Sequence, residues 1–165
     1  MLLVVRPFIS SFLSLPLTPT NPNLKILIIY TPYTYCVLTN KQVIHPTETH
    51  PSVILYGVAS RDLKTAQHQA KQYNFAKAYG SYQDLLDDPA VDFVYISTPN
   101  AFHYEWASKA LKAGKHVLCE KPFTANADEA RKLVELGKEK GLVVEEAVCV
   151  HFNNTVFAFE SGLGG

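Results

Sequence analysis

The sequence lacks several features that would point to particular classes of protein. Its 165 residues include only three cysteines, Cys36, Cys119 and Cys149, so neither a disulfide framework nor a zinc knuckle is indicated. Fifteen basic and fifteen acidic side chains cancel, without a basic cluster, which argues against nucleic acid or an anionic membrane as a partner. No apolar run reaches the roughly 20 residues of a membrane-spanning helix. The six histidines show no metal-ligand spacing. We therefore expect a globular, cytoplasmic protein without a metal.

Glycine and charge are nearly absent from the first third of the chain. Residues 1–52 contain no glycine and only four charged side chains, but they hold seven of the ten prolines. Proline removes a backbone donor and fixes φ, so it interrupts helices and central strands. We therefore expect residues 1–24 to be disordered. The apolar start is similar to a secretory signal, but Arg6 interrupts it and no cleavage site follows, so export is disfavoured.

From residue 53 the sequence alternates between apolar runs and amphipathic segments. The runs predict strands at 53–60, 91–98, 115–120 and 142–150, with 24–30 as a candidate strand in front of them. Apolar residues at helical spacing predict helices over 62–73, from 82 to near 89, from about 102 to 114, and from 127 to 141. Strands that are apolar on both faces, each followed by a helix, predict a doubly wound α/β domain with a parallel sheet.

Capping patterns and helical spacing predict where the helices begin and which faces they bury. Ser81 with Asp84, and Asn126 with Glu129, are typical of helix starts. The expected inner faces of the last two helices are formed by Phe102, Trp106, Ala107, Ala110 and Leu111, and by Ala127, Ala130, Leu133, Val134 and Gly137.

Ligands of an open parallel sheet bind outside the carboxyl ends of the strands, so the turns that follow the strands are candidate binding segments. Ser60 and Arg61 follow the strand at 53–60, and a guanidinium with a serine hydroxyl suits the 2′-phosphate of NADP better than the ribose of NAD. The alternative is that Arg61 is a solvated surface residue and that Asp62 caps the next helix.

Two further turns carry candidate residues. Thr98-Pro99-Asn100 follows the strand at 91–98, and Glu120-Lys121-Pro122 follows the strand at 115–120. The Lys121 ammonium at the sheet edge can polarise a substrate hydroxyl or carbonyl, with Glu120 orienting it. The alternative is an ordinary exposed ion pair at the end of a strand. His103, taken alone, is more typical of a capping or packing residue.

Long stretches of the sequence resemble a known family. VASRD (58–62), the run from AYGSYQDLL to GKHVLCEKPF (78–123) and EEAVCVHF (145–152) are similar to the Gfo/Idh/MocA family of NAD(P)-dependent oxidoreductases. Within that family they resemble the dihydrodiol dehydrogenase and NADP-dependent D-xylose dehydrogenase branch. The resemblance implies hydride transfer between a sugar or trans-dihydrodiol hydroxyl carbon and NADP, in an assembly of identical subunits.

The resemblance also implies the residues that contact NADP and its substrate. Ser60 and Arg61 would face the adenosine 2′-phosphate. Glu120 and Lys121 would lie near the nicotinamide, with Lys121 as the catalytic candidate. The residues that would line the dinucleotide crevice are Ser97, Thr98, Asn100 and His103.

The sequence departs from the family at both ends. Family members begin with a strand and a G-x-G-x-x-G/A turn whose glycines admit the pyrophosphate, whereas this chain reads LIIYTPYTYCVLTN there. They also continue into a large substrate domain. We therefore expect a Rossmann-like domain over 25–147, atypical over 25–52, with 148–165 as a truncated start of the second domain. Two alternatives to an active enzyme are a catalytically dead nucleotide-binding or protein-interaction module, and a chain that does not fold stably.

Overall fold

A computed structural model describes residues 24–30, 44 and 53–147, and within them six strands form one parallel sheet. The strand order is β3-β2-β1-β4-β5-β6, and every neighbouring pair is parallel. The strands are β1 (Leu24–Tyr30), β2 (Val53–Ala59), β3 (Lys77–Tyr79), β4 (Phe93–Ser97), β5 (His116–Glu120) and β6 (Val144–Ala147). The predicted doubly wound α/β fold is confirmed. The order reverses between β1 and β4, which places the topological switch point there.

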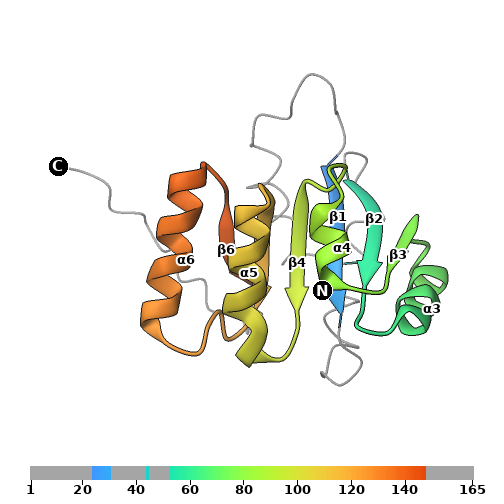
Figure 1. The fold of residues 1–165 in the computed structure, drawn as a ribbon, viewed down its shortest axis with the longest axis horizontal. Coiled ribbons are helices and arrows are strands. Elements are labelled where there is room, and N and C mark those ends of the chain that lie inside the picture. The colour runs from blue at the N-terminus through green and yellow to red at the C-terminus, as the bar shows by residue number, and fades with distance from the viewer. Residues whose placement is uncertain (1–23, 31–43, 45–52, 148–165) are drawn as a thin grey trace, which may run out of the picture.

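Helices connect the strands from β2 onward. They are α3 (Leu63–Tyr73), α4 (Tyr82–Asp87), α5 (His103–Lys112) and α6 (Ala127–Lys140), with a short 3₁₀ helix, η1 (Asn100–Phe102), just before α5. Figure 1 shows α4, α5 and α6 on the same face of the sheet, with α3 at the edge formed by β3. None of the helices in the described ranges is long and apolar enough to cross a bilayer.

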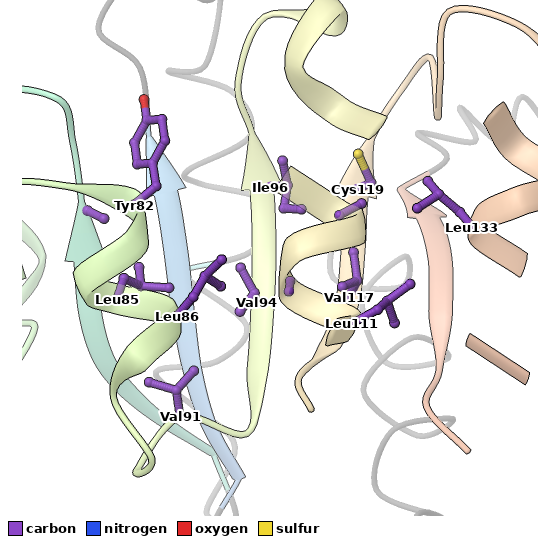
Figure 2. Close-up of a cluster of buried hydrophobic side chains, with 13 residues drawn as sticks. Tyr82, Leu85, Leu86, Val91, Val94, Ile96, Leu111, Val117, Cys119 and Leu133 are labelled. Atoms are coloured by element: carbon purple, nitrogen blue, oxygen red, sulfur yellow. The ribbon is translucent and has the colours of Figure 1, made fainter. Parts of the chain in front are cut away.

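The main core lies between the sheet and α4, α5 and α6. Alternate residues of β4 and β5 face these helices, because successive side chains of a strand point to opposite faces. Figure 2 shows the resulting cluster, in which side chains of α4, α5 and α6 meet those of the two strands. Its fully buried members include Leu85, Val94, Ile96, Leu111 and Leu133. This packing fixes where the carboxyl ends of the strands lie.

Capping side chains begin three of the helices. Asp62 accepts hydrogen bonds from the amides of Lys64 and Thr65 at the start of α3. Ser81 accepts one from Asp84 at the start of α4, and Asn126 accepts one from Glu129 at the start of α6. These caps satisfy backbone donors that the first turn of a helix leaves free. The capping patterns predicted at Ser81 and Asn126 are confirmed.

Three predictions about helix faces are wrong. Val134 is 40% exposed and Ala127 is also exposed, so the buried side of α6 is narrower than expected and is represented by Leu133 and Gly137. Phe102 is 44% exposed and belongs to η1, because the 3₁₀ turn rotates it away from the core face of α5. The short strand β3 was not anticipated.

Several expectations concern segments beyond the described residues. They are the disorder of 1–24, which overlaps the described part only at Leu24, the glycine-free turn after β1, and the truncated second domain at 148–165. The candidate strand at 24–30 is described and is β1. The strand expected at 142–150 is described as β6 up to Ala147.

Candidate functional site: the carboxyl ends of β2, β4 and β5

A pocket of about 450 Å³ lies beside the carboxyl ends of β2 and β4. Arg61 reaches it from the turn after β2, and Thr98 and Pro99 reach it from the turn after β4. Two of the three predicted turns therefore meet at one pocket. Asn100 and Lys121 are not among the described residues that line this pocket.

Aromatic rings form another part of the pocket wall. Tyr82, Phe102 and Trp106 all line it, and the rings of Tyr82 and Trp106 meet edge to face with centroids 5.0 Å apart. The Lys109 ammonium lies 4.1 Å from the centroid of the Trp106 ring and forms an ion pair with Glu105. Phe102 and Trp106 were predicted to lie in the core. Their closeness in the sequence to the Thr98-Pro99-Asn100 turn was the signal for a pocket wall.

The turn after β2 has one exposed and one buried candidate. Ser60 is 1% exposed, and its hydroxyl accepts a hydrogen bond from the Asp62 amide at 3.4 Å. Arg61 is exposed and reaches the Tyr82 hydroxyl. Burial raises the pKa of Tyr82, while the Arg61 guanidinium opposes that rise. Arg61 and Tyr82 thus both lie in the pocket wall.

Asp62 has the structural role that the alternative reading gave it. Its carboxylate accepts hydrogen bonds from the hydroxyl and the amide of Thr65, at 2.7 and 3.0 Å. These bonds, with a smaller one from the Lys64 amide, hold the pKa of Asp62 below its usual range. The helix cap at Asp62 and the pocket position of Arg61 coexist.

Thr98 carries an unsatisfied polar atom at the pocket. The residue is only 2% exposed, and its Oγ1 has no hydrogen-bond partner within the described structure. A buried hydroxyl without a partner costs about 1–3 kcal/mol, so such atoms are rare. Thr98 lines the pocket together with the aromatic rings and Arg61, so the pocket fits a ligand with both a flat apolar part and polar or anionic groups.

His103 lies behind the turns instead of on their surface. It has no exposed area, and its Nδ1 and Nε2 each lie 2.8 Å from a backbone carbonyl oxygen, those of Pro122 and Thr98 respectively. Each nitrogen donates to the carbonyl that it faces when it carries a proton. This arrangement favours support of the two turns, and direct contact of His103 with a cofactor stays a prediction.

Ser97 and Asn100 flank the second turn. Ser97 is the last residue of β4 and is 1% exposed, whereas Asn100 is exposed at the start of η1. Neither residue is among the described residues of the pocket wall, so their contact with a dinucleotide also stays a prediction.

The turn after β5 carries Glu120 and Lys121. One oxygen of Glu120 accepts a hydrogen bond from the Tyr95 hydroxyl, and the other accepts one from the Lys121 amide at 3.2 Å. Lys121 is exposed and precedes Pro122 through a cis peptide bond. Glu120 therefore contacts the backbone of Lys121. The Lys121 side chain lies on the surface, directly after the end of β5.

Other reactive side chains nearby are not suited to catalysis. Burial, with the carboxylates of Glu120 and Glu146 close by, raises the pKa of Cys119 strongly, so its thiol stays protonated. The described residues contain no cluster of three metal-ligating side chains. Glu146, which was not among the predicted site residues, accepts a hydrogen bond from the Phe123 amide at 2.7 Å through its carboxylate.

Comparisons with known proteins agree with this geometry. The family model of oxidoreductases with an NAD-binding Rossmann fold, GFO_IDH_MocA, matches residues 36–148. The chain is 53% identical over 77 residues to the D-xylose 1-dehydrogenase (NADP(+)) of Hypocrea jecorina, covering 47% of this chain and 20% of that protein. It is 43% identical over 106 residues to the trans-1,2-dihydrobenzene-1,2-diol dehydrogenase of Bos taurus, covering 64% and 32%.

Solved structures give the same result. An NAD binding oxidoreductase from Klebsiella pneumoniae superposes with a TM-score of 0.69 at 30% identity, over 76% of this chain and 34% of that one. A 3-ketoreductase from Actinomadura kijaniata in complex with NADP gives 0.68 at 30% identity, over 75% and 38%. The chain spans about a fifth of the length of the D-xylose dehydrogenase and about a third of that of the dihydrodiol dehydrogenase. With a parallel sheet of this order and a family match over most of its length, the chain belongs to the Gfo/Idh/MocA family of oxidoreductases with an NAD-binding Rossmann fold.

Proposed function

We propose that this chain is the cofactor-binding part of an NADP-dependent oxidoreductase that acts on a sugar or a trans-dihydrodiol. The observation that carries the proposal is the pocket where Arg61, Thr98 and three aromatic rings meet. The rings offer flat apolar surface to an adenine, and Arg61 offers a fixed positive charge to a 2′-phosphate. The two relatives reported above are named as an NADP(+) xylose dehydrogenase and a dihydrodiol dehydrogenase, which supports the substrate class.

Different site residues contact the two ends of the dinucleotide. Arg61 and Ser60 bind the phosphorylated ribose, and the Thr98 hydroxyl bonds to a polar atom of the same half. Lys121 lies on the half of the sheet formed by β4, β5 and β6, where its amine would accept the proton of the substrate hydroxyl as the hydride leaves the carbon, and its ammonium would return that proton in the reverse direction. The bound nicotinamide supplies the hydride acceptor or donor. Asn100, Ser97 and His103 shape the turn between these two regions.

Titration with nucleotides tests the cofactor assignment. Trp106 is the only tryptophan of the chain and lies in the pocket wall, so its fluorescence reports binding there. We expect NADPH to quench this fluorescence saturably and to bind more tightly than NADH. No saturable change with either nucleotide would overturn the proposal.

Arg61→Ala separates phosphate recognition from general binding. We expect NADPH affinity to fall about tenfold or more, because a charge-assisted hydrogen bond contributes roughly 1.5–3 kcal/mol, while NADH affinity changes little. Arg131→Ala is the matched control, since that guanidinium is exposed on α6 and pairs with Asp128. An equal loss for both nucleotides would contradict a role in reading the 2′-phosphate.

Steady-state assays decide between an enzyme and a binding module. With NADP and either D-xylose or a trans-dihydrodiol, hydride transfer is followed by the absorbance of the reduced nicotinamide. Turnover that Lys121→Ala abolishes supports the dehydrogenase. Saturable NADPH binding without turnover of either substrate supports the nucleotide-binding module instead.

A further inference from the structure

The turn formed by Lys121, Pro122 and Phe123 is fixed by contacts from three directions. The Lys121 amide donates to Glu120 at the end of β5. The Pro122 carbonyl lies 2.8 Å from the His103 ring at the start of α5. The Phe123 amide donates to a carboxylate oxygen of a residue on β6. Since Lys121 itself is exposed, the position of its side chain depends on the backbone that these contacts hold.

The contact from β6 comes from Glu146. Its Oε1 accepts the Phe123 amide hydrogen at 2.7 Å, a charge-assisted bond of the strong kind. Glu146 lies opposite Cys119 in the parallel ladder between β5 and β6, and its side chain is half-buried. The same turn is held on its other side by the Cys119 thiol, which lies 3.7 Å from the Phe123 carbonyl oxygen. Glu146 thus reaches across from the next strand to the far end of the turn.

This contact has features of a positioning device. A carboxylate near the end of a strand commonly faces solvent. The Glu146 carboxylate instead accepts a hydrogen bond from a backbone amide two residues beyond Lys121. A carboxylate oxygen holds an amide in one direction, so it restricts the turn more tightly than van der Waals packing alone. The residue comes from β6, which contributes none of the described residues that line the pocket.

We propose that Glu146 is a positioning residue that fixes the Lys121–Phe123 turn so that the Lys121 ammonium meets the nicotinamide end of the bound dinucleotide. The inference rests on the proposed function, because it takes the NADP-binding orientation from it. It adds a residue of β6 to the site and makes the placement of Lys121 depend on two neighbouring strands, β5 and β6.

Two ligands distinguish this role from general stability. NADPH carries the nicotinamide, whereas 2′-phospho-ADP-ribose is the same molecule without it. With the 165-residue chain, we expect Glu146→Ala to weaken NADPH binding about fivefold and to leave 2′-phospho-ADP-ribose binding unchanged. Glu146→Gln retains an acceptor oxygen and should restore most of the NADPH affinity. Glu145→Ala, the adjacent carboxylate on the opposite face of β6, is the matched control.

A double-mutant comparison links Glu146 to Lys121. Once Lys121→Ala has removed the ammonium, Glu146→Ala should cause no further loss of NADPH affinity, because the two residues then act on the same contact. Additive losses, or equal losses for both ligands, would overturn the inference while leaving the proposed function intact. Failure of the unaltered chain to bind either ligand would overturn both.

Hydrogen exchange gives a readout without any ligand. The Phe123 amide should exchange slowly in the unaltered chain and in Glu146→Gln, and faster in Glu146→Ala, with helix α6 unchanged. Unchanged protection of that amide in Glu146→Ala would overturn the inference even if the variant binds nucleotides poorly.

Discussion

Lys115 is the most deeply buried charged side chain described and stabilises the loop between α4 and β4. It is 6% exposed, and its ammonium donates to the carbonyls of Asp88 and Val91 at 2.9 and 2.8 Å. Burial lowers its pKa, and the carboxylates of Asp92 and Asp88 oppose that effect. The ammonium therefore links two carbonyl groups of the loop that follows α4.

Replacing this ammonium should lower stability. Lys115→Met keeps much of the apolar stem but removes the donor that the two carbonyls share, although the Asp88 carbonyl keeps its bond from the Val91 amide. We therefore expect a loss of about 1–3 kcal/mol in the free energy of unfolding. Urea unfolding followed by circular dichroism measures it. Lys112→Met, at an exposed position at the end of α5, is the control and should change stability little. Equal effects of the two changes would contradict the role of the carbonyl contacts.

Asp88 gives a pH-dependent contribution at the same loop. Its Oδ2 accepts hydrogen bonds from Lys77 and from the Tyr79 hydroxyl, both at 2.7 Å. The Lys77 bond, followed by that from Tyr79, holds the pKa of Asp88 well below its usual range despite burial. A lowered folded-state pKa means that the stabilisation is complete above the unfolded-state value, near 4, and is lost as pH falls below it.

Asp88→Asn should therefore be less stable at neutral pH but not in acid. We expect a deficit of about 1–3 kcal/mol at pH 7 that shrinks as pH falls below about 4, because the parent chain then loses the contribution that the variant never had. Unfolding curves at a series of pH values measure the difference. Asp87→Asn, an exposed neighbour, should show a difference that does not vary with pH in this way. A deficit independent of pH would show that the carboxylate charge is not responsible.

At the scale of elements, α6 and β6 approach each other through a glycine. A Cβ at Gly137 would lie 2.9 Å from Val144 Cγ1 and 3.1 Å from the Leu142 carbonyl oxygen. Alanine is favoured over glycine inside a helix by about 1 kcal/mol, but here it collides with a β-branched side chain and with backbone. The close approach brings β6, with Glu146, against the turn after β5.

Gly137→Ala should therefore destabilise the protein instead of stabilising it. We expect a net loss of about 1–3 kcal/mol, the usual cost of overpacking. Thermal unfolding measures it, with Lys138→Ala on the exposed side of α6 as the control. Adding Val144→Ala to Gly137→Ala should cost less than the sum of the two single changes. A higher melting temperature in Gly137→Ala would contradict the tight helix–strand contact.

Elements with a strong local pattern could be predicted from the sequence, and those set by tertiary contacts could not. The alternation of apolar runs and amphipathic segments predicted five of the strands and the main helices. The strand β3 has only three residues and forms because it pairs with β2. Val134 is apolar and lies at helical spacing from the buried residues of α6, yet it is 40% exposed. The spacing of apolar residues does not determine how α6 is rotated against the sheet.

The candidate site divides in the same way. The rule that ligands meet the carboxyl ends of strands predicted that Arg61 and Thr98 share a region, and the pocket brings them together. It did not predict the aromatic wall, since Trp106 follows the same spacing as core residues. It also did not find Glu146, because the partner of that carboxylate is 23 residues away in the chain.

For the whole molecule, ligand binding and stability are linked. If NADPH binds the folded state and not the unfolded state, a concentration 100 times its dissociation constant should raise the free energy of unfolding by about 2.7 kcal/mol. Thermal unfolding with NADPH, NADH and neither nucleotide measures this shift. We expect the largest rise in melting temperature with NADPH, and about half that stabilisation or less in Arg61→Ala at the same NADPH concentration, because a tenfold weaker affinity leaves about 1.4 kcal/mol. An identical rise in the parent chain and in that variant would place binding elsewhere.

The central place of β1 determines how this chain tolerates shortening. The strand pairs with β2 on one side and with β4 on the other, so in the described part of the chain the strand hydrogen bonds that join the two halves of the sheet run through it. A version that started at Val53, to discard the proline-rich front, would leave two half-sheets with bare hydrogen-bonding edges. Such edges recruit strands from other molecules, and the expected product of that trimming is insoluble aggregate. The strand that joins the fold thus lies in front of residues 36–148, the part that the family model matches.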